Sequence, residues 1–149
     1  MPSFGELWVK SKGKPVIYNG QKIWHSDRFK VADGQRLKVT FESVNSDWRQ
    51  GISLDVDGNF TCNGQTIKKK IILWQHTAPR EFIVTVHSKK GEVDVWNTWD
   101  TGNGVTEALY NGAAMIIEEI NETTKRYRCN DGRPDDDFDD LIFTIELLK

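Results

Sequence analysis

The segment 130–140, called here the acidic segment, concentrates oxygen-bearing side chains that could bind a cation. It reads Asn-Asp-Gly-Arg-Pro-Asp-Asp-Asp-Phe-Asp-Asp and holds six aspartates and one asparagine in eleven residues. Ca²⁺ prefers about six to eight oxygen ligands, which carboxylates and backbone carbonyls of a bent loop supply. We therefore predict a Ca²⁺ site, with candidate ligands Asn130, Asp131, Asp135, Asp136, Asp137, Asp139 and Asp140.

The order of these residues is not that of an EF-hand, because the D-x-[DN]-x-[DN]-G pattern with a final glutamate is missing. The alternative is a solvated acidic turn that keeps the apolar strand expected at 141–145 soluble. Phe138 favours metal binding, since an apolar side chain among aspartates indicates a segment that folds back onto the protein.

A second group of residues, at 96–104, has the mixture of side chains that sugar sites use. Aromatic faces stack on the C–H face of a pyranose, while amides and carboxylates hydrogen-bond its hydroxyl groups. The alternative is a strand end with core tryptophans, which all-β proteins commonly contain. The candidate sugar-binding residues are Trp96, Asn97, Trp99, Asp100 and Asn103.

Catalytic chemistry has no comparable pattern. His25, His76 and His87 stand apart, without a serine elbow or a Cys/His pair. Glu118 and Glu119 are adjacent, so in a strand they would point to opposite faces and could not act as a glycosidase pair. We expect a non-enzymatic protein, and a carboxylate pair drawn from distant segments is the alternative that stays open.

The elements that must position these groups are predicted to be strands. Asn-Gly and Asp-Gly dipeptides, which favour tight hairpin turns, recur along the chain, among them those at 19, 33, 57, 63, 111 and 131. Apolar and polar residues alternate at 37–41 and 52–56. About ten strand-like runs, among them those at 7–9, 52–56, 60–62, 81–87 and 92–96, predict an all-β fold, an antiparallel two-sheet β-sandwich or jelly roll.

The region 105–120 is ambiguous, since its apolar residues also fit a helical stripe. Gly112 interrupts that stripe, and the polar residues 121–124 look like a turn into a strand at 125–129. We therefore favour a hairpin, which would lead the chain directly into the acidic segment.

Length and composition exclude several classes of protein. The 149 residues carry a formal charge of −2 and scattered lysines and arginines, so we expect one domain, 1–149, without nucleic-acid binding. No apolar run suits membrane insertion and no signal peptide is recognisable, so we expect a soluble protein, cytoplasmic or exported without a classical signal. Cys62 and Cys129 have no metal-ligand spacing and are expected to be thiols.

The stretch from Tyr127 to Ile145 resembles the calcium-dependent galactose-binding lectins of soluble bacterial type. In that family, a Tyr-Asn-Asp segment precedes a loop whose side chains hold Ca²⁺, and the ion coordinates sugar hydroxyls. Asn130-Asp131 matches the start of the loop and 135–137 the rest. Cys129 stands where the family has its tyrosine, and the loop is more acidic, so sugar specificity does not carry over. The ending also looks like structural calcium loops of other bacterial β-modules.

These features together predict a Ca²⁺-dependent, lectin-like carbohydrate-binding module that binds a carbohydrate or glycoconjugate. The alternative is a non-catalytic structural or protein-interaction β-sandwich, in which calcium or the acidic loop only stabilises a turn. Formation of a homo-oligomer is open under either hypothesis.

Overall fold

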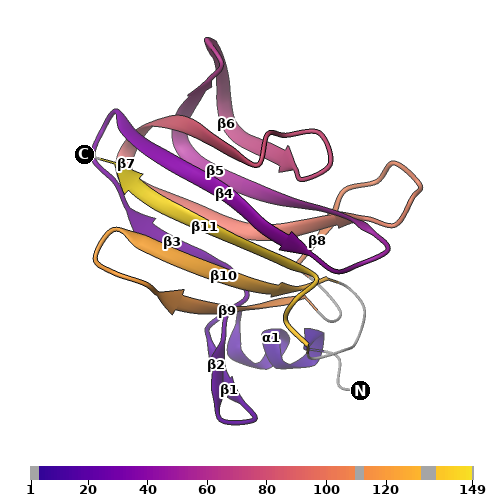
Figure 1. Ribbon diagram of the computed structural model, residues 1–149. Helices are drawn as coiled ribbons and strands as arrows, with labels where there is room; N and C mark the ends of the chain where they lie inside the picture. Colours follow the sequence, from indigo (N-terminus) through magenta and orange to yellow (C-terminus); the bar gives the residue numbers. More distant parts are fainter. Residues whose placement is uncertain (1–3, 110–112, 132–136, 149) are drawn as a thin grey trace.

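The computed structural model describes residues 4–109, 113–131 and 137–148 and has antiparallel sheets packed against each other (Figure 1). The all-β sandwich prediction is confirmed. In chain order the elements are α1 (Gly5–Ser11), β1 (Val16–Tyr18), β2 (Gln21–Ile23), β3 (Asp27–Lys30), β4 (Gln35–Val44), β5 (Arg49–Cys62), β6 (Gln65–Trp74), β7 (Glu81–Asp100), β8 (Glu107–Ala108), β9 (Ala114–Glu119), β10 (Thr124–Asn130) and β11 (Leu141–Leu148).

The main sheet has the strand order β6-β5-β7-β4-β11-β10-β9, and β1 and β2 form a separate hairpin. The long strand β7 pairs with β4 through Glu81–Val86 and with β3 through Glu92–Val95. It also pairs with β5, so it lies in the interior of the main sheet. Figure 1 shows α1 and the β1–β2 hairpin at the end of the molecule where β9 lies.

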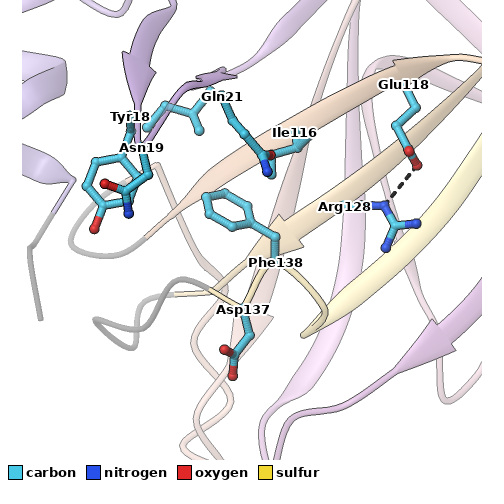
Figure 2. A pocket seen from close by; sticks show the side chains of 9 residues that line it. Tyr18, Asn19, Gln21, Ile116, Glu118, Arg128, Asp137 and Phe138 are labelled. Atoms are coloured by element: carbon cyan, nitrogen blue, oxygen red, sulfur yellow. Dashed lines mark hydrogen bonds and ion pairs between the residues drawn. The ribbon is translucent and has the colours of Figure 1, made fainter.

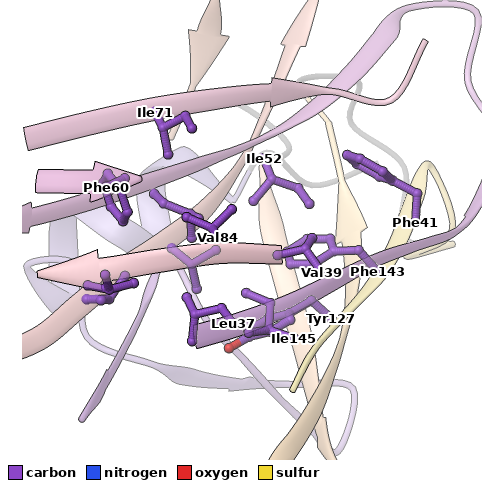
Figure 3. Close-up of a cluster of buried hydrophobic side chains, with 14 of the residues drawn as sticks. Leu37, Val39, Phe41, Ile52, Phe60, Ile71, Val84, Tyr127, Phe143 and Ile145 are labelled. Atoms are coloured by element: carbon purple, nitrogen blue, oxygen red, sulfur yellow. The ribbon is translucent and has the colours of Figure 1, made fainter. Parts of the chain in front are cut away.

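The core follows from the alternation of apolar side chains along the strands. Leu37 and Val39 of β4 and Ile52 and Leu54 of β5 are fully buried, and Figure 3 shows several of these side chains pointing toward one another from different strands. Burying one such side chain contributes about 1.5–3 kcal/mol. Because successive strand residues point to opposite faces, the same alternation places polar side chains on the outer surface.

Two of the predicted strand boundaries are wrong. The runs at 52–56 and 60–62 belong to one strand, β5, and the Asp-Gly dipeptide between them forms a bulge instead of a hairpin turn. A side chain at Gly58 would collide with the carbonyl oxygen of His87, so glycine allows the two strands to approach there. Similarly, the runs at 81–87 and 92–96 are both parts of β7.

The run at 7–9, predicted as a strand, lies in the helix α1. Phe4 and Trp8, one helical turn apart, are buried together with Ile23 and Phe138 in a second apolar cluster. The indole Nε1 of Trp8 donates a 2.8 Å hydrogen bond to the carbonyl oxygen of Ala113. This contact with a distant segment favours the helix, and the local sequence pattern gives no sign of it.

The hairpin predicted for the region before the acidic segment is confirmed. β9 and β10 pair antiparallel, with Ile116 opposite Arg128 and Glu118 opposite Arg126. The helical alternative is not adopted by the described part of 105–120, which contributes β8 and β9. No helix among the described residues is long and apolar enough to cross a membrane.

The two cysteines are separate thiols, and only Cys129 is fully buried. Burial raises the pKa of the Cys129 thiol well above its ordinary value, and the nearby carboxylate of Asp140 adds to the effect. The charged thiolate is disfavoured in both respects, so Cys129 acts as an apolar core residue next to the acidic segment.

Candidate functional site

Asn130, the last residue of β10, joins the acidic segment to the body of the protein. Its backbone carbonyl accepts a 2.7 Å hydrogen bond from the side-chain amide of Asn97 on β7. Its side-chain oxygen accepts a 2.7 Å bond from the backbone N–H of Phe138. Because the second bond links residues 130 and 138, it closes the acidic segment into a loop.

Asp131 places a carboxylate in the interior. The side chain is fully buried, and its Oδ2 accepts hydrogen bonds from the Ser46 hydroxyl at 2.7 Å and from the Gln50 amide at 3.0 Å. Burying a charge is costly unless hydrogen bonds compensate for lost hydration. These donors, from the loop after β4 and from β5, therefore hold the start of the acidic segment in place.

The end of the acidic segment is also held by the loop after β4, through Asn45. The buried Asp140 carboxylate accepts a 2.9 Å bond from the backbone N–H of Asp131. The N–H of Asn45 donates to the carbonyl of Asp140 at 3.1 Å, and its side-chain amide donates to Asp139 at 2.9 Å. Asp131 and Asp140, near the two ends of the segment, are thus fixed side by side.

The predicted Ca²⁺ ligands differ in their surroundings. Asn130, Asp131 and Asp140 are buried, Asp139 bonds to Asn45, and the exposed Asp137 lines a cavity. Asp135 and Asp136 lie outside the described residues. Within 4–109, 113–131 and 137–148, no three His, Cys, Asp or Glu side chains gather into a metal-ligand group. A metal site of several carboxylates would therefore have to include Asp135 or Asp136.

The cavity beside the acidic segment is about 400 Å³ in volume (Figure 2). It lies between the β1–β2 hairpin, the outer face of β9 and β10, and Phe138 of the acidic segment. The Phe4 ring contacts both Tyr18 and Phe138, at centroid distances of 4.9 and 5.9 Å, and so supports the two aromatic walls from behind. The lining residues are Tyr18, Asn19, Gln21, Ile23, Ile116, Glu118, Arg128, Asp137 and Phe138.

Paired charges form one side of this cavity. Within the lining, Arg128 Nε donates to Glu118 at 2.8 Å. Next to this pair but outside the lining, Arg126 Nε lies 2.8 Å from Glu42. The hydrogen bond that Arg126 donates to Glu42, together with the charge of that carboxylate, raises the pKa of Arg126, so the guanidinium stays protonated. Arginine has five donor hydrogens, and the described contact of Arg128 with Glu118 uses Nε. A ligand in the cavity thus meets the Arg128 guanidinium beside the Glu118 carboxylate.

The predicted sugar-binding group at 96–104 is not brought together on one surface. Asn97 and Trp99 are each 1% exposed. The Asp100 carboxylate is buried and accepts hydrogen bonds from the N–H groups of Gly102 and Gly104 at 2.8 and 3.2 Å. These polar atoms stabilise the turn after β7.

Trp96 and Asn103 are the more accessible members of that group. Trp96 is half-buried, and the Lys70 ammonium lies 5.1 Å from the centre of its ring. Trp96 and Trp99 are three residues apart in one strand, so they face opposite sides of the sheet. Asn103 is exposed and accepts a 3.0 Å hydrogen bond from the N–H of Val105.

Sequence reasoning did not single out Tyr18, Asn19, Gln21 and Arg128. The Asn19-Gly20 dipeptide indicates the hairpin that carries Tyr18, Asn19 and Gln21. The neighbouring sequence does not indicate which surface this hairpin covers. Glu118 was considered only with its neighbour Glu119. The structure pairs Glu118 across the strands with arginines instead.

A comparison of the chain with models of known protein families and with curated protein sequences finds no match. The chemistry and geometry of the cavity and the acidic segment are therefore what indicate a function.

Replacing Asp131 with alanine should lower the free energy of unfolding by about 2–4 kcal/mol, because buried donors of Ser46 and Gln50 lose their acceptor. The exposed Asp137 is the matched control, and Asp137→Ala should change stability by about 0.5 kcal/mol or less. Urea unfolding followed by tryptophan fluorescence measures both. Equal effects of the two substitutions would contradict the structural role of Asp131.

Proposed function

We propose that this protein is a non-catalytic carbohydrate-binding module that binds sugar in the cavity of Figure 2, with Ca²⁺ held by the acidic segment. The observation that carries the proposal is the composition of the cavity, in which two aromatic rings lie beside amides and a guanidinium–carboxylate pair. Its volume of about 400 Å³ lies within the range of about 300–1,000 Å³ typical of small-molecule sites.

The aromatic and polar walls suit the two kinds of surface that a sugar presents. Tyr18 and Phe138 offer apolar ring surface to C–H groups. Asn19 and Gln21 can both donate to and accept from hydroxyl groups, while Arg128 donates only. A sugar could therefore satisfy its hydroxyls without leaving its apolar face in water.

Asp137 connects the proposed sugar site with the proposed metal site. It lines the cavity and belongs to the acidic segment, next to Asp135 and Asp136 in the sequence. Ca²⁺ bound by these carboxylates would lie at the cavity rim and could accept sugar hydroxyls as further oxygen ligands. This arrangement is similar to that of the calcium-dependent lectins which the segment resembles.

Calcium should raise the thermal unfolding midpoint, because a ligand that binds only the folded state stabilises it by RT ln(1 + [L]/Kd), about 2.7 kcal/mol at a hundredfold excess over Kd. Differential scanning calorimetry in Ca²⁺ and in EGTA measures the change. Asp136→Asn or Asp137→Asn should abolish it, whereas Asp57→Asn, an exposed aspartate on β5, should not. Identical curves for the wild-type protein in both buffers would refute the calcium site.

Sugar binding should depend on the cavity and not on Trp96 of β7. A glycan array in Ca²⁺ identifies the best sugar, and titration calorimetry then compares variants. Tyr18→Ala should weaken binding about tenfold or more, since stacking and ring burial are lost. Trp96→Ala is the matched control and should bind normally. Loss of binding only with Trp96→Ala would move the site to 96–104, and the absence of any bound glycan would refute the proposal.

A further inference from the structure

The strand β9 forms one outer edge of the main sheet, and its backbone is only partly paired there. Met115 exchanges two 2.8 Å hydrogen bonds with Trp24, so its N–H and C=O point away from β10. Backbone directions alternate along a strand, so Ile117 and Glu119 point to the same side as Met115. Beyond the Trp24–Met115 pair, β2 lies beside β9 on that side, but among the described residues the two strands form no hydrogen-bonded ladder there.

This edge has fewer of the features that usually prevent pairing with another chain than the opposite edge has. The opposite edge strand, β6, carries three consecutive lysines, 68–70, with Lys69 at a φ of 66° and a break in its ladder. Charged side chains and bulges of this kind block the addition of strands. The β9 edge instead presents half-buried Ile116 and Ile117, followed by Ile120, which is 47% exposed.

Two cavities lie along the free edge of the sheet. One has a volume of about 510 Å³ and is lined by Lys22 of β2, Trp24, Ile117 and Glu119, and Ile116 borders both cavities. The other is the cavity of Figure 2, which Ile116 and Glu118 line. Successive side chains of a strand point to opposite faces, so an added strand could place alternate side chains in the two cavities.

Pairing of β9 with a second copy of itself is disfavoured. Antiparallel self-pairing centred on Glu118 places this residue opposite Glu118 of the second copy, and centring on Glu119 does the same for Glu119. Directly opposed like charges are destabilising. Centring on Ile117 places Glu119 opposite Met115, where Trp24 already occupies the edge. The free edge therefore fits a strand of different sequence.

The exposed charges near the edge define the chemistry of that strand. Glu119 and Glu122 are exposed, and neither forms an ion pair with another described residue. The nearby Lys125 is engaged with Asp27 at 3.1 Å. We propose that the free edge of β9 binds an extended peptide segment of a partner protein, in which basic residues alternate with aliphatic ones, by β-strand addition.

The probe is a capped octapeptide of alternating lysine and valine, and the readout is amide hydrogen exchange by NMR. In the free protein, the amides of Ile117 and Glu119 should exchange faster than that of Met115, and saturating peptide should slow both. A peptide of the same sequence with N-methylated valines is the control, because it keeps the charges and removes backbone donors. It should bind at least about tenfold more weakly, as expected for the loss of several hydrogen bonds.

A charge-reversed protein tests the predicted sequence preference. Glu119→Lys combined with Glu122→Lys should weaken binding of the lysine–valine peptide about fivefold, as expected for two exposed ion pairs. It should also bind a glutamate–valine peptide that the wild-type protein does not bind. Circular dichroism checks that the variant is folded.

Three results would overturn the proposal. Equal binding of the N-methylated peptide would mean that charge alone attracts it. Protection of Ile117 and Glu119 that rises with protein concentration, without peptide, would mean that a second copy occupies the edge. Unchanged exchange at saturating peptide would exclude strand addition at β9.

Discussion

The buried hydrogen bonds around Asn130 and Asp131 determine where the acidic segment lies. A fully buried carboxylate is tolerated only with donors around it, and Ser46 and Gln50 supply them from a region about eighty residues earlier in the chain. Asn97 on β7 adds a third attachment. Three strands of the sandwich thus have to be correctly placed before the segment can be fixed, which couples the position of the segment to the whole fold.

Fixing the segment has a direct consequence for the cavity. The bond from the Phe138 N–H to Asn130 fixes the backbone at Phe138, whose ring lies 5.9 Å from that of Phe4 and forms a cavity wall beside Asp137. The other walls come from the β1–β2 hairpin and from Arg128, which are more than a hundred residues apart in the sequence. The cavity is therefore a product of tertiary packing, in which aromatic surface, amides and paired charges meet.

Local sequence patterns predicted the parts of the fold that local physics controls. Alternation at 37–41 predicted a half-buried strand, and the Asn-Gly dipeptides at 19 and 63 predicted hairpin turns that the structure contains. The Asp-Gly dipeptide at 57 gave the same signal but forms a bulge, because β7 continues to pair on both sides of it. The strand prediction at 7–9 failed because the Trp8 indole finds its partner at Ala113.

The acidic segment was visible in the sequence because its composition is unusual, but its internal division was not. Nothing in the run of aspartates indicates that Asp131 and Asp140 are buried while Asp137 is exposed, since this depends on Ser46, Gln50 and Asn45. The cavity was missed for the same reason. Its residues are ordinary in type, and only the register of β9 against β10 and the position of the hairpin bring them together.

The most direct test of this account is the hydrogen-exchange rate of the Phe138 amide, measured by NMR in the wild-type protein and in Asn130→Ala. In the wild type, exchange should be slowed at least about a hundredfold relative to an unstructured peptide. The substitution should remove this protection, while the amides of β4 and β5 stay protected. Exchange of Phe138 at the unstructured rate in the folded wild-type protein would contradict the claim that Asn130 holds the acidic segment against the cavity.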